Sequence, residues 1–295
     1  MRGNMATSEQ TVIFVHIPKT AGTTMYQVIQ RNYASKAMYV IGVDGWHDEF
    51  KRLSDCRKAE LLLIGGHAGF GMHRFLPKPC AYFTILRDPI ERTISDYYYI
   101  RRTPQSGFYD QVNAKNISLL DFLNLGLDAL VDNGQTRLLC GLENGFEVGF
   151  GECTREMLET AKRNLRDHFV VVGLTEEFDA TLILLKKALG WRKLAYARQN
   201  VSPNRLKQSE ISQVTLDAIA RVNVLDAELY DYARTLFEEQ VRQQGASFAQ
   251  EVKDFQKANQ WLGPLVRLYL EARKVSVRTM LRQWIQRRHG SPARA

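Results

Sequence analysis

The chain has 295 residues, of which 45% are apolar and 24% are charged, as in an ordinary folded protein. Its 20 glycines and 8 prolines exclude collagen-like or low-complexity sequence. No run of about 18 apolar residues predicts a membrane span, and residues 1–10 contain no apolar signal core. We therefore expect a cytoplasmic protein with one large α/β domain or two small ones.

The net charge of +8 is unevenly distributed along the sequence. Leu265–Ala295 contains eight basic residues and one acidic residue, which leaves a net charge of only +1 for the first 264 residues. A basic nucleic-acid-binding domain would carry its charge within the folded part, so we expect no nucleic-acid partner.

The first third of the chain alternates predicted strands and helices. Thr11–Ile17 is a short β-rich run that predicts a buried parallel strand, and Thr23–Ala34 has helical spacing. Met38–Val43 and Leu61–Ile64 predict two further strands on either side of a polar helical stretch, Trp46–Lys58. A strand, a glycine-containing turn and a helix form the opening of a βαβ unit.

The middle of the chain continues this alternation. Ala81–Leu86 predicts another buried strand, and Pro89 suits the first turn of a helix that continues to about Arg102. A polar loop is expected over Thr103–Asn116, and Phe169–Leu174 predicts the last strand, with Thr175 as the N-cap of the next helix. Helices are predicted over Leu119–Leu127, Gly134–Leu139 and Arg155–Leu165.

The C-terminal part is predicted to be helical after a polar loop at Tyr196–Lys207, with breaks near Gly245 and at Gly263-Pro264. The pattern predicts a three-layer α/β fold, a parallel sheet flanked by helices, with a helical C-terminal extension. We expect a flexible N-terminus at residues 1–10, the main domain at 11–245, and a basic amphipathic extension at 246–295.

The turn after the first strand carries a candidate anion site. Lys19, Thr20, Ala21, Gly22, Thr23 and Thr24 offer a cation, hydroxyl groups and backbone N–H groups at a helix N-terminus. The standard nucleotide loop, G-x-x-x-x-G-K-[ST], is absent, and no strand ends in an aspartate suited to hold Mg²⁺ opposite the turn. We therefore expect no metal. A transferring sulfuryl group fits a site without a metal, because it carries less charge than a phosphoryl group and has less need of a divalent cation.

These residues also carry a family resemblance. HIPKTAGTT resembles the 5′-phosphosulfate loop of sulfotransferases, in the carbohydrate group related to heparan sulfate 2-O-sulfotransferase, and RDPIERTISDYYY resembles the family's 3′-phosphate segment. The resemblance implies the P-loop-like sulfotransferase fold and the donor 3′-phosphoadenosine 5′-phosphosulfate (PAPS). It assigns Arg87 and Ser95 to the 3′-phosphate, while Arg92 is expected in a structural salt bridge. Ser202 and Arg205 are expected to cover the adenine, and VGLTEE and NGQTRLLCG extend the likeness.

Histidine is the natural base for transfer to a hydroxyl group near neutral pH. His67 follows a predicted strand in the segment GGHAGF, which resembles the family segment with the catalytic histidine. His67 is therefore the predicted base and Lys19 the predicted stabiliser of the leaving oxygen. His73 is the alternative base, and His16 is expected to shape the pocket.

The acceptor is predicted to be a hydroxyl group of a glycan or glycolipid. A metal-dependent phosphotransferase and a non-catalytic nucleotide-binding module are the alternative functions. The four cysteines are expected to be free thiols, although the family resemblance also allows a disulfide between Cys140 and Cys153. The amphipathic tail from Leu265 could pack on its own domain, form a homodimer, clamp an acidic glycan or lie on a membrane.

Overall fold

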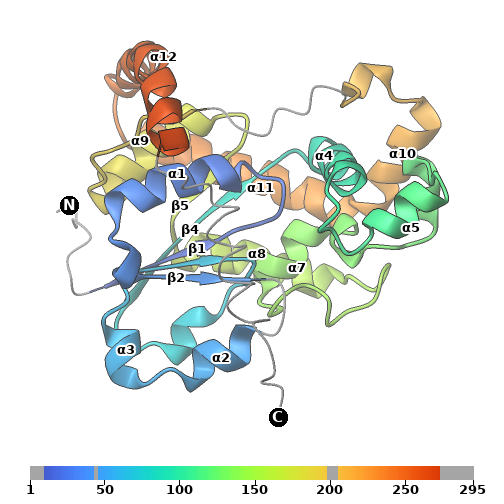
Figure 1. The fold of residues 1–295 in the computed structure, drawn as a ribbon, viewed down its shortest axis with the longest axis horizontal. Coiled ribbons are helices and arrows are strands. Elements are labelled where there is room, and N and C mark those ends of the chain that lie inside the picture. Colours follow the sequence, from blue (N-terminus) through green and yellow to red (C-terminus); the bar gives the residue numbers. More distant parts are fainter. Residues whose placement is uncertain (1–9, 43–45, 198–204, 273–295) are drawn as a thin grey trace.

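The computed structural model describes residues 10–42, 46–197 and 205–272, and these form an α/β fold around one parallel sheet (Figure 1). The strands are β1 (Thr11–Val15), β2 (Met38–Ile41), β3 (Leu63–Gly66), β4 (Cys80–Leu86) and β5 (Phe169–Leu174). The helices are α1 (Gly22–Asn32), α2 (Trp46–Arg52), α3 (Asp55–Ala59), α4 (Pro89–Arg102), α5 (Tyr109–Ala114), α6 (Leu119–Asn124), α7 (Gly134–Cys140), α8 (Arg155–His168), α9 (Phe178–Leu189), α10 (Gln213–Val222), α11 (Val224–Arg242) and α12 (Phe248–Ala272).

The sheet has the strand order β2-β3-β1-β4-β5, and all its pairings are parallel. β1 lies in the middle and is buried along its whole length, which explains its continuous apolar sequence. In Figure 1, α1 and α9 lie on one side of the sheet, α8 lies on the other, and α12 lies outside α9. The predicted α/β class, a parallel sheet between helices, is confirmed.

A second, smaller core lies beside the sheet. It joins α4, α5, α6 and α10 through buried side chains such as Ile94, Phe122 and Ile219. Thr103–Asn116 was expected to be a loop, and this expectation is wrong because it contains α5. Val112 of α5 is fully buried in this core, which gives the short polar segment a reason to be helical.

Three local predictions at element ends are also wrong. The third strand starts two residues late and includes Gly65 and Gly66, which pair with β1 and β2. Thr175 does not cap α9; its N–H and hydroxyl groups both donate to the Leu86 carbonyl, at 2.8 and 3.1 Å. The helix α12 continues through Pro264, and Gly263 lies so close to the Tyr196 carbonyl that a Cβ would be 2.9 Å away.

The described cysteines are free thiols, as expected, so Cys140 and Cys153 form no disulfide. Burial raises the pKa of the Cys153 thiol to about 12. Within the described residues, no helix is both long enough and apolar enough to cross a membrane. Residues 1–9 and 273–295 lie outside the described residues, and so does most of the predicted N-terminal segment and of the basic tail.

Two helix N-termini cap each other beside the sheet. Asp226 of α11 accepts hydrogen bonds from the N–H groups of Gln135 (3.0 Å) and Thr136 (2.7 Å) at the start of α7. Asn133, before α7, accepts from the N–H groups of Leu225 and Asp226 at 2.9 and 3.0 Å. Each helix therefore satisfies backbone donors that the other helix would leave unpaired.

Arg92 forms the predicted structural salt bridge. Its guanidinium group lies 3.8 Å from the Asp226 carboxylate, both side chains are fully buried, and it also donates to the Leu130 carbonyl at 2.6 Å. Removal of one partner would leave the other as an unpaired buried charge, which is costly.

We expect Asp226→Ala to lower the free energy of unfolding by about 3–5 kcal/mol, because it leaves Arg92 and the α7 N-terminus without a partner. Glu228→Ala is the matched control on the same helix; it breaks only the exposed pair with Arg155 and should cost about 0–1 kcal/mol. Denaturant titration followed by circular dichroism measures both values. Equal losses in the two variants would contradict this role of Asp226.

Candidate active site

Three predicted site residues directly follow neighbouring strands. His16 follows β1, His67 follows β3 and Arg87 follows β4. Because β1 pairs with both β3 and β4, the three residues lie at one edge of the sheet, at the carboxyl ends of the strands. The connections from β1 and β4 leave in opposite directions, toward β2 and β5, and such a switch point is where open α/β sheets bind ligands.

The turn between β1 and α1 presents its backbone to this edge. Lys19 and Ala21 have positive φ angles of 69° and 63°, and Thr20 lies between them. Alternation of left- and right-handed conformations makes neighbouring N–H groups converge into an anion-binding hollow. No described side chain caps α1, whose N-cap is Ala21. The turn therefore has the geometry of an anion site made of backbone N–H groups.

The three threonines of the turn differ in what they can offer. Thr20 is fully buried and its hydroxyl donates to the Ile17 carbonyl at 2.8 Å, so only its backbone N–H can serve a ligand. Thr24 is also buried, at 8% exposed, whereas Thr23 is partly exposed. The predicted donor set is therefore reduced mainly to backbone groups and the Lys19 ammonium group.

The ring of His16 packs so close to Gly22 that it leaves no space for a side chain at this position. A Cβ at this position would lie 1.8 Å from Nε2 of His16, so any larger residue collides with the imidazole ring. The ring of His16 in turn lies 4.5 Å from that of His67, measured between centroids. His16 therefore fills the space between the anion-binding turn and His67.

His67 is held in its neutral form. Burial is the largest cause that lowers the pKa of His67 to about 4, Lys19 adds to the effect, and the backbone of His16 opposes it. Nδ1 of His67 is buried and has no hydrogen-bond partner among the described residues. At neutral pH the ring is thus an unprotonated base with one unused polar atom.

Lys19 is a cation in an environment that disfavours charge. Its Nζ lies 3.8 Å from the centroid of the Tyr99 ring, within the range of a cation–π contact. Burial lowers the pKa of Lys19 to about 8, and the nearby Arg102, Arg87 and Arg205 add to the effect. The buried carboxylate of Asp96 opposes the shift. Lys19 is therefore charged at neutral pH but close to losing its proton.

Arg87 is fixed from both sides. Its backbone N–H and carbonyl groups are both bonded to the side-chain amide of Gln135, at 3.0 and 2.9 Å. Its Nη1 donates to the Lys19 carbonyl at 3.2 Å, which joins the 3′-phosphate segment to the first turn. The sequence analysis assigned no role to Gln135, although it lies in the segment NGQTRLLCG.

Arg205 lies beside Arg87 and shares a counter-ion with it. Nη2 of Arg87 lies 3.1 Å from Oε2 of Glu91, and Arg205 donates to the same oxygen. Nε of each arginine is buried without a partner in the part of the chain that the structure describes. Two guanidinium groups with unused donors around one carboxylate form a place where a doubly charged anion could bind.

The other predicted residues are placed as follows. Ser95 is partly buried on α4, one residue before Asp96. His73 lies away from this edge: its Nδ1 is 2.9 Å from the hydroxyl of Tyr82, four residues before Leu86 at the end of β4. Ser202 lies outside the described residues.

Sequence reasoning missed Glu91, Asp96, Tyr99 and Gln135. The first three lie on α4, and only Glu91 is at helical spacing from its partner, Arg87; nothing in the sequence indicates that Asp96 and Tyr99 lie near Lys19. The contact between Gln135 and Arg87 joins residues 48 positions apart and has no local signal.

Comparison with known proteins identifies the family. The family model for galactose-3-O-sulfotransferase matches residues 4–274, which is most of the sequence. The chain belongs to this sulfotransferase family. Human heparan-sulfate 6-O-sulfotransferase 1 is 24% identical over 282 residues, which cover 78% of this chain and 66% of that protein. Zebrafish heparan-sulfate 6-O-sulfotransferase 2 is 26% identical over 279 residues, covering 78% and 58%.

The chain thus spans about two thirds of the length of the human relative and 58% of the zebrafish relative. A crystal structure of mouse sulfotransferase SULT7A1 complexed with PAP covers 86% of this chain and 91% of its own, with a TM-score of 0.36 and 15% identity. The predicted family of PAPS-dependent sulfotransferases is confirmed, while the narrower resemblance to the 2-O-sulfotransferase stays a prediction.

The contact between His16 and Gly22 can be tested by a double-mutant cycle. Gly22→Ala should lower the free energy of unfolding by about 1–3 kcal/mol, the usual cost of overpacking. In a His16→Ala background the same change should cost nothing, because the ring is gone and alanine favours the helix more than glycine does. Thermal or denaturant unfolding of the four proteins measures the coupling. An equal loss in both backgrounds would rule this contact out.

Proposed function

We propose that this protein transfers a sulfuryl group from PAPS to a hydroxyl group of a carbohydrate. The main support for the proposal is that two candidate anion sites, the Lys19 turn and Arg87 with Arg205, lie at the same edge of the sheet as the neutral ring of His67. The Lys19 turn and Arg87 are joined by a hydrogen bond of 3.2 Å, and His67 lies behind the turn across the ring of His16. Family membership supports the same reaction class.

The residues present fit a donor that carries two separate anionic groups. The backbone N–H groups and Lys19 would hold the 5′-phosphosulfate end. Arg87, with its unused buried Nε, would hold the 3′-phosphate together with Ser95 on α4. Arg205 lies beside Arg87 across Glu91, so we assign it to the 3′-phosphate rather than to the adenine.

His67 would act as the base in an in-line transfer. As the acceptor oxygen bonds to sulfur, its hydroxyl proton passes to the imidazole, and the bond from sulfur to the donor's phosphate oxygen breaks. Burial is the largest cause that lowers the pKa of His67, which leaves the ring unprotonated at neutral pH. Lys19 and the turn would stabilise the charge that develops on the leaving phosphate oxygen.

A carbohydrate acceptor follows from the names of the relatives, which act on heparan sulfate or galactose. We propose a glycan or a glycolipid hydroxyl as the acceptor class. The metal-dependent phosphotransferase has less support, because the carboxylate that directly follows Arg87 already has a structural role: Asp88 caps α4 and accepts from the Glu91 N–H group at 2.9 Å.

The donor assignment predicts selective binding of a 3′-phosphate. Adenosine 3′,5′-bisphosphate should raise the melting temperature clearly more than ADP does, since only the former reaches Arg87. Arg87→Ala should weaken bisphosphate binding by about 1.5–3 kcal/mol, as for a lost charge-assisted contact. Arg57→Ala, which alters an exposed pair on α3, is the control and should change nothing. Equal stabilisation by the two nucleotides would exclude this donor.

The proposed base can be tested with labelled PAPS and a panel of oligosaccharide acceptors. His67→Ala should lower turnover by about 10²–10⁴-fold, the usual contribution of a general base, and leave bisphosphate affinity unchanged. His73→Ala should retain near-normal turnover, because that histidine lies away from the sheet edge. Transfer should also persist in EDTA. Normal turnover in the His67 variant would exclude it as the base.

A further inference from the structure

The second half of α12 exposes an apolar ridge. Trp261, Leu265 and Leu268 are 82%, 60% and 62% exposed, and their i, i+4, i+7 spacing places them on one face of the helix. The first half of the same helix behaves differently, since Phe248 is only 3% exposed and Phe255 packs against the main core. The ridge (Trp261, Leu265 and Leu268) is therefore the part of α12 that the described domain does not cover.

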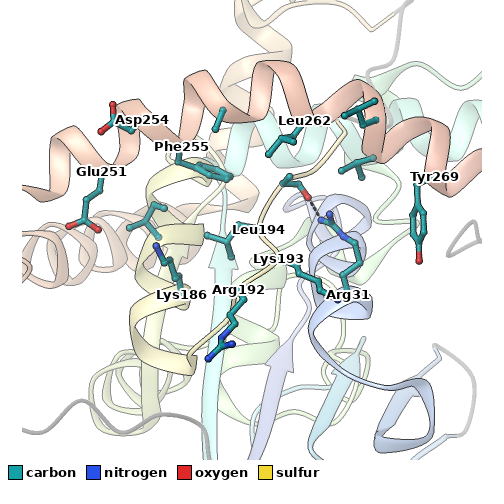
Figure 2. Close-up of a pocket in the computed structure, with 15 residues that line it drawn as sticks. Arg31, Lys186, Arg192, Lys193, Leu194, Glu251, Asp254, Phe255, Leu262 and Tyr269 are labelled. Atoms are coloured by element: carbon teal, nitrogen blue, oxygen red, sulfur yellow. Dashed lines mark hydrogen bonds between the residues drawn. The ribbon is translucent and has the colours of Figure 1, made fainter.

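Basic side chains line the groove beneath this part of the helix, while on the helix itself Arg267 pairs with Glu271. A groove of about 850 Å³ runs under α12, and Leu262 and Tyr269 line one end of it (Figure 2). Arg31, Arg192 and Lys193 line the groove from α1 and the segment after α9. The acidic lining residues, Glu251 and Asp254, lie toward the other end of the groove in Figure 2.

The sequence that follows the ridge extends this charge. Residues 273–295 contain seven basic residues and no acidic residue. The described part of the chain thus places an exposed tryptophan and leucines beside a groove with basic lining residues, and the sequence that follows it is basic. That combination matches an interfacial helix, which inserts its apolar face among lipid headgroups while basic groups attract anionic lipids.

We propose that this surface, the α12 ridge with its basic surroundings, docks on an anionic membrane. Charge and hydrophobicity together favour an anionic membrane over a second copy of the chain or a sulfated glycan. A second copy of the chain would bring the same basic residues, Arg31, Arg192 and Lys193, to the contact, and the like charges would repel. A sulfated glycan could neutralise the charge but offers no apolar surface to cover Trp261 and Leu268. A bilayer with anionic lipids satisfies both features.

The experiment is co-sedimentation of the full chain with vesicles. Binding is expected to phosphatidylcholine vesicles with about 30% phosphatidylserine and not to pure phosphatidylcholine, and it should weaken about tenfold or more when salt rises to about 0.5 M. Brominated lipids should quench the tryptophan fluorescence of the wild type, and Trp261→Phe should lose most of that quenching.

Two double variants separate the ridge from exposed apolar residues in general. Trp261→Ser with Leu268→Ser should lose vesicle binding at least tenfold while the melting temperature stays unchanged, because both side chains are already exposed. Val214→Ser with Val224→Ser removes side chains that are 65% and 51% exposed on α10 and α11, and should bind like the wild type.

Three results would overturn the proposal. The first is no binding to anionic vesicles at low salt, and the second is unchanged binding by the ridge variant. The third is self-association in sedimentation velocity that the ridge variant abolishes, without vesicle binding, which would assign the ridge to a second copy. None of these results depends on sulfuryl transfer, so they leave the proposed function untouched.

Discussion

The central position of β1 is the constraint on which the site depends. β1 pairs with β3 on one side and β4 on the other, so the residues that end these three strands must be neighbours. His16, His67 and Arg87 come together for this reason, although they span 71 positions of the sequence. Because the chain leaves β1 at the same edge, its first turn also delivers backbone N–H groups there.

The edge of the sheet gathers more positive charge than a protein interior tolerates by itself. Burial is the largest cause that lowers the pKa of Lys19, and the nearby Arg87 and Arg205 add to it. Two carboxylates offset it: Glu91 pairs with both arginines, and Asp96 faces Lys19. These two carboxylates thus offset part of the positive charge that the site gathers.

The sequence was sufficient for the parallel sheet, because apolar runs are local signals, whereas the anion-binding turn and the candidate base stay predictions. It failed at Thr175 and Pro264, where tertiary hydrogen bonds and close packing outweigh local preference. It did not indicate that Gly22 makes room for the ring of His16. Contacts such as Gln135 with Arg87 depend on the assembled fold and leave no local pattern.

The mutual capping of α7 and α11 limits how this sequence can change. Asn133 and Asp226 each accept hydrogen bonds from backbone N–H groups of the other's helix. Gln135, two residues after Asn133, is hydrogen-bonded to the backbone of Arg87. A substitution of either capping residue would destabilise the N-terminus of the other helix. Through Gln135 it would also displace the backbone of Arg87. Substitutions at positions 133 and 226 should therefore occur together during evolution. Such paired changes preserve both the capping of the two helices and the position of Arg87.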